Sequence, residues 1–305
     1  MTFNWDNYNF IDYLNISNIE INNLPKEISI STMCSSCKLN TKLNILNIEN
    51  YLQLNTNDIL SIKINTVRMR TLLLINKSKQ IKKNDIVRNY FYNQITVVIR
   101  ITHGYTDNLN DEPKINMKLF KNGSVQMSGC KNINNINIAL NKLIFRLKEI
   151  KAKLENGIII EKLFIDNIDD IDNLYIKDFK IDMINSNYKL NMQIDRLKLY
   201  NLLLKKKIKS IYEPCIRACV IIKYIPNENN IEGKEISIFI FQKGNIIITG
   251  ARSKQHIISS YEYINNILLN HYEDIIKKDD KYEENLIFSI YNDILKDIEI
   301  GLIKI

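Results

Sequence analysis

Five cysteines and three histidines are the side chains of this 305-residue chain that most readily hold a metal ion or act in catalysis. Cys34 and Cys37 have the C-x-x-C spacing of half a zinc site, and Cys215 and Cys219 can supply the other half. Neither pair has a histidine or the glycines of a zinc knuckle nearby. We therefore favour buried thiols that pack as small hydrophobic groups, with no metal and no cofactor.

Sequence motifs of common enzymes are missing from the chain. It contains no P-loop, no H-E-x-x-H and no G-x-S-x-G, and His103, His256 and His271 are far apart in the sequence. The sequence therefore predicts a protein that is not an enzyme.

The net charge of +8 and the pI of about 9.0 suit a polyanionic partner. No apolar run reaches the roughly 18 residues of a membrane span, and the N-terminus does not resemble a signal peptide. The odd number of cysteines indicates a reducing compartment. We expect no membrane association.

The chain contains an internal duplication. The segment FKNGSVQMSGCKN starts at Phe120, and FQKGNIIITGARS starts 121 positions later, at Phe241. Phe, two glycines, a hydroxyl residue and a cation recur at matching places. Residues 37–50 match 188–201, and 97–101 match 220–224, in the same order. The first half is 28 residues longer, and we expect its insert, at about 67–92, to be a solvated loop.

Each half reads as strand, helix, several strands and a long helix. The leucines of 39–46 and the apolar residues of 190–197 have helical spacing, and long helices are expected over about 136–150 and 257–268. Asn122-Gly123 and Lys243-Gly244 predict tight hairpin turns. Hairpin-connected strands form antiparallel sheets, so the sequence predicts an α+β fold with helices on one face.

Alternation along the strands separates the two faces of that sheet. Val125 and Met127 point to the helices, whereas Phe120, Gln126 and Ser128 point the other way. The second repeat places Phe241, Ile247 and Thr249 at the corresponding positions. Exposed aromatic and apolar residues beside hydroxyls and cations are typical of a binding surface.

These residues resemble a known family, the TATA-box-binding proteins. The resemblance rests on the pattern of 241–252, on Tyr212-Glu213-Pro214, and on Phe179-Lys180-Ile181 followed by Lys189-Leu190. The resemblance covers roughly residues 27–272. The chain is similar to the divergent family members found in large DNA viruses; a protist with an AT-rich genome is an alternative source. It implies a saddle in which two direct repeats form one curved antiparallel sheet, with helices on the convex face.

The resemblance also implies minor-groove binding, in which Phe wedges unstack base steps and bend AT-rich promoter DNA. The wedge positions hold Phe120, Phe241 and Arg217, and the hydroxyl positions hold Ser128 and Thr249. Ile30, Gln126 and Ile247 match the lining of the groove floor. Phosphate-contacting positions hold Arg100, Lys131, Lys223 and Arg252. The two groove-reading Asn positions hold Ile28 and Met183.

Further expectations concern partners and location. Tyr212, Glu213 and Pro214 match the loop that contacts transcription factor IIB, so the resemblance implies a factor of that kind, RNA polymerase machinery and a monomeric chain. It implies the nucleus for a cellular protein, and a cytoplasmic viral factory or the virion for a viral one. The alternative function is an interaction scaffold that keeps this fold but has lost sequence-specific DNA binding.

The expected organisation has four parts: an N-terminal extension (1–26), repeat 1 (27–155), repeat 2 (156–272) and a C-terminal extension (273–305). The last part holds nine acidic residues and five lysines. Ile287, Tyr291, Ile294 and Ile298 have helical spacing and predict an amphipathic helix. We expect it to pack on the long helices; the alternative is that it competes with DNA for the basic residues.

Overall fold

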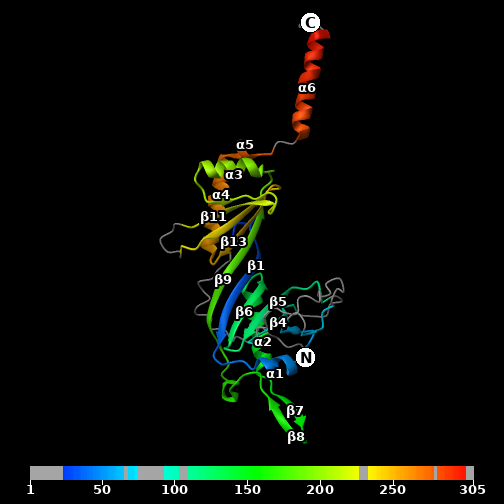
Figure 1. Cartoon of the computed structure of the whole chain (residues 1–305), viewed down its shortest axis with the longest axis vertical. Coiled ribbons are helices and arrows are strands. Elements are labelled where there is room, and N and C mark those ends of the chain that lie inside the picture. The colour runs from blue at the N-terminus through cyan, green and yellow to red at the C-terminus, as the bar shows by residue number, and fades with distance from the viewer. Residues whose placement is uncertain are drawn as a thin grey trace. The chain divides into compact units, whose positions relative to one another are not determined.

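The computed structural model describes residues 23–64, 68–74, 93–102, 109–226, 233–277 and 280–299. The chain forms two compact units (Figure 1). The first unit is Met1–Ser186 with Thr249–Gln255, and the second is Asn187–Ile248 with His256–Ile305. Both are built from antiparallel strands and helices, which confirms the predicted α+β class.

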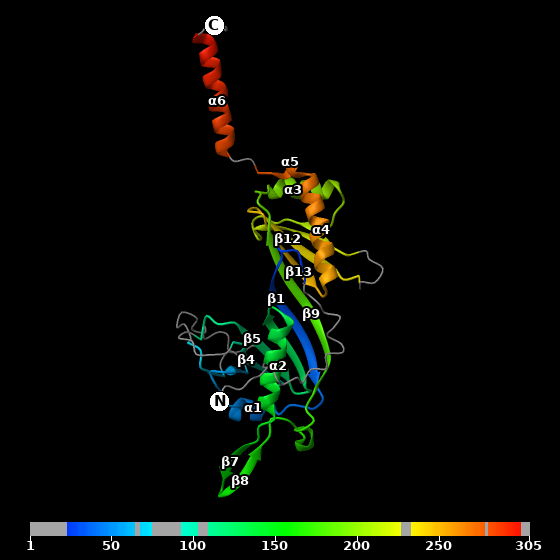
Figure 2. The same ribbon diagram turned by 180° about the vertical axis from the view of Figure 1, so that it is seen from behind.

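The first unit is a sheet in the order β9-β1-β6-β5-β4-β2-β3. Helix α2 (Ile133–Leu147) lies across one face of this sheet (Figure 2), and Val125, Met127, Leu140 and Leu143 are buried. The strands are β1 (Ser29–Leu39), β2 (Ile59–Lys63), β3 (Met69–Thr71), β4 (Gln94–Arg100), β5 (Lys114–Phe120), β6 (Ser124–Cys130) and β9 (Ile176–Lys189).

The second unit has the strand order β10-β11-β12-β13-β9. Its long helix is α4 (Lys254–Asn270; Figure 2). Ile257, Ile264 and Leu268 of α4 are buried. The other elements are β10 (Ser210–Ile211), β11 (Cys219–Tyr224), β12 (Ile236–Phe241), β13 (Asn245–Ala251), α3 (Arg196–Lys205) and α5 (Tyr272–Ile275). The boundaries between the two units fall inside β9 and β13.

Two glycines show why the duplication keeps its turn residues. Gly123 and Gly244 have φ values of +87° and +77°, which L side chains rarely adopt. A Cβ at either position would lie 2.2 Å from a backbone oxygen, that of Thr41 or of Leu190. Both hairpins therefore require glycine, and the repeated pattern reflects the same backbone contact in each unit.

The first helix of each repeat begins later than the leucine spacing predicted. Leu39 lies in β1, and Leu43 and Ile194 form isolated bridges before α1 (Ile45–Tyr51) and α3. The side chains of Asn44 and Asp195 accept hydrogen bonds from the first turns of α1 and α3, so each helix starts at its cap. The prediction that these apolar residues share one helical face was wrong.

The insert of the first half is only partly described, because residues 65–67 and 75–92 lie outside the described residues. Its described part contains β3, which pairs with β2, so this part is strand rather than loop. Between the repeats, β7 (Lys151–Glu155) and β8 (Ile158–Lys162) form a separate hairpin, which is followed by a short 3₁₀ helix, Ile168–Asp170. Sequence reasoning did not predict this hairpin.

The C-terminal extension forms helix α6 (Asp280–Glu299), as its apolar spacing predicted. Its described apolar side chains from 287 to 295 are exposed, including Ile287 at 67%, Phe288 at 68% and Tyr291 at 57%, whereas Ile298 is half-buried. The expected packing on the long helices is therefore wrong for Ile287, Tyr291 and Ile294 of the predicted stripe.

Candidate nucleic-acid interface

The sheet face opposite α2 in the first unit, which we name the open face, carries the residues predicted for it. Register pairs Lys118 with Gln126 and Asn116 with Ser128, which places these side chains on one side of β5 and β6. Gln126 is exposed, whereas Phe120 and Ser128 are half-buried. Ile30 is half-buried on β1. The first unit therefore brings Phe120, Gln126 and Ser128 together, as the alternation predicted.

The corresponding open face of the second unit is more apolar. Phe241 and Ile247 are half-buried. Phe239 is also half-buried on the same side of β12 as Phe241, and Ile221 lies opposite it on β11. Sequence reasoning missed Phe239, although its position two residues before Phe241 on one strand was the available signal.

The hydroxyl of Thr249 has a hydrogen-bond partner in the first unit that the sequence did not predict. Its hydroxyl donates a hydrogen bond to Oδ1 of Asn185 on β9, and Oγ1 lies 3.7 Å from Sδ of Met183. All three side chains are half-buried. An amide is therefore placed beside the predicted hydroxyl, where the sequence had suggested only the loss of an Asn at position 183.

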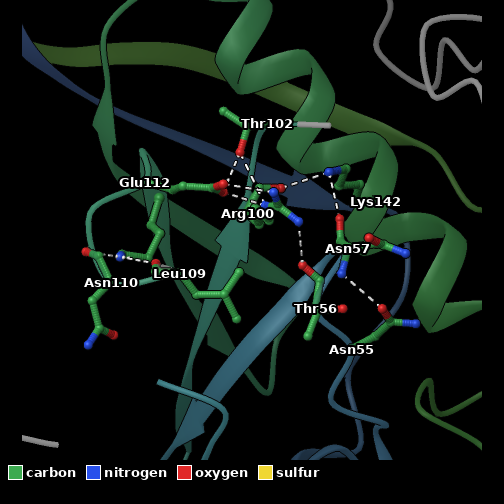
Figure 3. Close-up of polar contacts among 10 residues, drawn as sticks. Asn55, Thr56, Asn57, Arg100, Thr102, Leu109, Asn110, Glu112 and Lys142 are labelled. Carbon is green, nitrogen blue, oxygen red and sulfur yellow. Dashed lines mark hydrogen bonds and ion pairs between the residues drawn. The ribbon is translucent and has the colours of Figure 1, made fainter. Parts of the chain in front are cut away.

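Arg100 does not have the exposure that a phosphate contact requires. Its side chain is 2% exposed and forms an ion pair with Glu112, with Nη2 2.8 Å from Oε1. Nη1 donates to the carbonyl of Thr56 at 3.0 Å, and Nε donates to the hydroxyl of Thr102 at 3.2 Å (Figure 3). The assignment of Arg100 to phosphate binding was wrong, because its guanidinium is part of the interior of the first unit.

Lys142 completes this buried network. Its Nζ donates to the carbonyls of Arg100 and Asn57, at 2.8 and 2.9 Å (Figure 3). Burial lowers the pKa of Lys142 to about 8, because the charged ammonium is removed from water. The network ties α2 to β4 and to the segment before β2, so it supports the sheet rather than a ligand.

The other predicted cations have different surroundings. Lys131, Arg252 and Arg217 are exposed. Lys223 is 27% exposed; its Nζ donates to Oγ of Ser237 at 2.8 Å and lies 3.3 Å from the carboxylate of Glu235. A phosphate contact by Lys223 therefore competes with an existing ion pair.

Acidic side chains also line the open face of the first unit. A hollow of about 540 Å³ beside Phe120 is lined by Lys38, Asp178, Lys180 and Asp182, among others. Asp178 and Lys180 are exposed, and Asp182 is half-buried. Sequence reasoning did not place these carboxylates there, and they oppose the approach of a phosphate backbone.

The predicted partner loop is anchored at one end. The ring of Tyr212 lies 5.9 Å from the ring of Tyr200 and 5.8 Å from the guanidinium of Arg196. Glu213 and Pro214 are exposed. The carbonyl of Glu213 accepts hydrogen bonds from the backbone of residues 216 and 217, which form a tight turn. This arrangement fixes the backbone and presents Glu213 and Pro214 to solvent.

The cysteine pairs do not converge on a metal in the described part of the chain, where no group of three or more potential metal ligands occurs. Cys34 is half-buried and Cys37 is buried, because residues three apart on a strand face opposite sides. Burial raises the pKa of Cys37 to about 12. Cys215 is exposed and Cys219 is buried.

Within the described segments no helix is long and apolar enough to cross a membrane.

Two sequence comparisons with known proteins agree on a family. The sequence profile of the family described as transcription factor TFIID (or TATA-binding protein, TBP) matches residues 178–271. The TATA-box-binding protein-like protein of Acanthamoeba polyphaga mimivirus is 37% identical over 265 residues, which span 81% of this chain and 66% of that protein. The TBP of Methanococcus jannaschii aligns with 80% of this chain and 99% of its own, with 16% identity and a TM-score of 0.46.

The two sequence matches carry the assignment. The profile covers the second repeat, where the glycine turn and the Tyr212-Glu213-Pro214 loop are found, and the mimivirus alignment extends over most of the chain. This chain is a divergent member of the TATA-box-binding protein family.

Proposed function

We propose that the chain is a transcription initiation factor that binds duplex DNA through the minor groove and bends it. The observation that carries this proposal is the pair of open faces, each with a Phe at the same repeat position, Phe120 and Phe241. Half-buried apolar side chains on the uncovered side of an antiparallel sheet need a ligand that offers apolar surface. Unstacked base pairs in a bent minor groove provide such a surface.

The polar groups suit the same ligand. Ser128 supplies a hydroxyl toward the acceptors of A·T base pairs, and the Thr249 hydroxyl does so once it exchanges its bond to Asn185 for one to a base. The exposed Lys131 and Arg252 supply charge toward phosphates. The name of the mimivirus relative supports this reading, because that protein is described as TATA-box-binding protein-like.

The proposal includes a protein partner. Glu213 and Pro214 are exposed on a loop that Tyr212 anchors to α3, and the family resemblance assigns this loop to a factor like transcription factor IIB. Through such a factor the chain recruits RNA polymerase to the promoter as a monomer.

A double substitution tests the DNA proposal. Phe120→Ala with Phe241→Ala removes both wedges and should weaken binding to an AT-rich duplex by at least tenfold, with a smaller bend in an energy-transfer assay. Phe288→Ala is the matched control, because Phe288 is an exposed Phe of α6 outside the open faces. Equal affinity of the double variant and the control would show that the wedge assignment is wrong.

One observation favours a second candidate function. Asp178 and Asp182 lie beside Phe120, and Arg100 is withdrawn into the interior. These features suit an interaction scaffold in which the first unit binds a protein instead of DNA. Asp178→Asn with Asp182→Asn distinguishes the two: it should tighten DNA binding if DNA lies on this face, and should leave it unchanged if a protein does.

A further inference from the structure

The β7–β8 hairpin between the repeats is a small sheet of its own (Figure 1 and Figure 2). In the described part of the chain no third strand joins it. Its turn, Asn156-Gly157, has φ values of +52° and +80°, the two positive angles of a type I′ turn, which sets the strands in register. A sheet of two strands alone is only marginally stable in water. The hairpin therefore has the geometry of a sheet that a further strand can extend.

One face of the hairpin is held by ion pairs and turned toward α1. Residues directly opposite each other share a face, so Lys153, Glu155 and Lys162 lie together. The Nζ atoms of Lys153 and Lys162 lie 3.1 and 3.3 Å from Oε1 of Glu155. The Nζ of Lys162 also lies 5.9 Å from the centre of the Tyr51 ring on α1. These contacts fix which side of the hairpin is turned away from α1.

The opposite face of the hairpin is apolar and exposed. Leu154 lies directly opposite Ile159, and the two side chains are 67% and 71% exposed. Ala152 and Glu161 complete this face and are also exposed. Among the described residues no cation forms an ion pair with Glu161. The face thus offers two large apolar side chains and a carboxylate that lacks a cation.

Both edges of the hairpin carry backbone groups that point outward. In an antiparallel pair of strands, hydrogen-bonded residue pairs alternate with pairs whose N–H and C=O groups face away from the partner strand. A two-residue turn makes the pair next to it hydrogen-bonded, so the following pair, Leu154 and Ile159, faces outward. The same alternation turns the backbone of Glu161 outward on β8. A strand added to β8 would therefore bond to Ile159 and Glu161.

The side chains of the two edges differ. Lys151 and Lys153 lie along β7, and lysine on an edge strand opposes the addition of another strand. Strand β8 instead carries the uncharged run Ile158-Ile159-Ile160. Branched side chains of this kind pack well against a neighbouring strand. The edge of β8 is therefore the one suited to strand addition.

We propose that the edge of β8 binds an extended segment of a partner protein by strand addition, with a cation of that segment opposite Glu161 and an apolar side chain opposite Ile159. A second copy of β8 cannot supply this cation, because opposed residues share a face and the residues of β8 on this face are Ile159 and Glu161. Charge complementarity therefore favours a basic segment of a different protein. The proposal does not depend on DNA binding, because it involves no residue of the open faces.

A peptide with this chemistry tests the proposal. The full-length chain is titrated into the fluorescein-labelled peptide VTKTVTV, which in antiparallel register places its lysine opposite Glu161 and a valine opposite Ile159. Fluorescence anisotropy measures binding, and hydrogen exchange followed by NMR measures the protection of backbone amides. The wild type should bind the peptide, and the amides of Ile159 and Glu161 should become protected when it does.

Two proline variants distinguish the edge from the apolar face. Ile159→Pro removes an outward N–H of β8 and should weaken peptide binding by roughly tenfold or more. Leu154→Pro is the matched control, because it removes an outward N–H of β7 and an exposed apolar side chain of the same face, and it should leave binding unchanged. Both substitutions retain the hydrogen bonds between β7 and β8, and thermal melts verify that the variants are folded.

A charge reversal tests the contact with Glu161. The peptide VTETVTV, with glutamate in place of lysine, should bind the wild type about fivefold more weakly, because like charges are then opposed across the strands. Glu161→Lys should restore the affinity for this second peptide. If both peptides bind the wild type equally well, no cation is selected and the proposed chemistry of the partner is wrong.

Four further results would overturn strand addition by a partner. The first is no binding of VTKTVTV to the wild type at concentrations up to about 1 mM. The second is an equal loss of binding in both proline variants, which would place the peptide on the apolar face. The third is a wild-type dimer that Ile159→Pro converts to a monomer, since a second copy would then occupy the edge. The fourth is protection of the Ile159 and Glu161 amides in the free monomer, which would assign the edge to another segment of this chain.

Discussion

At the scale of single residues, Arg100 and Lys142 are two cations that belong to one buried network. Arg100 is paired with Glu112, and Lys142 is held by two backbone carbonyls. Removal of one partner from a buried ion pair leaves a charge without compensation, which is more costly than the pair itself is stabilising.

We expect Arg100→Ala to destabilise the first unit by about 3 kcal/mol, because the Glu112 carboxylate loses its partner. The salt dependence of DNA binding should be unchanged, because Arg100 is not exposed to phosphate. Chemical denaturation and a salt titration of binding measure the two effects. If Arg100→Ala has wild-type stability and a reduced salt slope, Arg100 contacts phosphate and the burial argument is wrong.

Lys142 should make stability depend on alkaline pH. Its pKa is about 8 in the folded chain against 10.5 for an unperturbed lysine, so the unfolded state binds more protons between these values. The titration of Lys142 therefore raises the free energy of unfolding as the pH increases from about 8 to 10.5, by about 3 kcal/mol at most.

The comparison of wild type with Lys142→Met isolates this contribution. The buried Cys37 and Cys130 have raised pKa values and lower the stability above pH 9, but they do so in both proteins. Denaturation series at pH 7 to 10 measure the free energy of unfolding of both proteins. The stability of the wild type relative to Lys142→Met should increase steadily as the pH rises. A constant difference would contradict the pKa assignment.

The residue positions of the open faces were predictable from strand parity and from the repeat. Phe120, Gln126, Ser128, Phe241 and Ile247 all lie where alternation placed them. The burial of Arg100 was not predictable, because its partner Glu112 lies 12 positions away in the sequence and no periodicity relates the two. The bond between Thr249 and Asn185 likewise joins residues 64 positions apart.

At the scale of elements, the hairpin glycines connect sequence to structure most directly. Gly123→Ala should destabilise the first unit by roughly 3 kcal/mol, because it combines positive φ with a Cβ placed against the carbonyl of Thr41. Gly157→Ala is the matched control: it has φ of +80° but open space around its Cβ, and should cost about 1 kcal/mol. Equal losses in thermal melts would show that the contact with Thr41 is unimportant.

Helix α6 shows the limit of periodicity. Apolar spacing predicted the helix, but it does not identify what covers an apolar stripe, and Ile287, Tyr291 and Ile294 of this stripe are exposed. Deletion of residues 280–305 should therefore leave the melting temperature within about 2 °C of wild type. A large decrease would show that α6 packs on the rest of the chain in solution.

At the scale of the whole molecule, the duplication predicted the fold class because each half had to form the same elements. The matched glycine turns and the α+β composition followed from that repeat. The β7–β8 hairpin belongs to one half only, so no internal comparison could reveal it. The charge of +8 predicted a polyanionic partner without locating it, since part of the positive charge is buried.

The salt dependence of binding to an AT-rich duplex tests the central claim most directly. With Arg100 excluded, Lys131, Lys223 and Arg252 remain as phosphate-contacting residues, which predicts a log–log slope of about −3 from about −0.9 per phosphate. Arg252→Ala should reduce the magnitude of that slope by about one. The full chain should bind the duplex with this slope; a slope near zero, or no binding at low salt, would contradict DNA binding through the open faces.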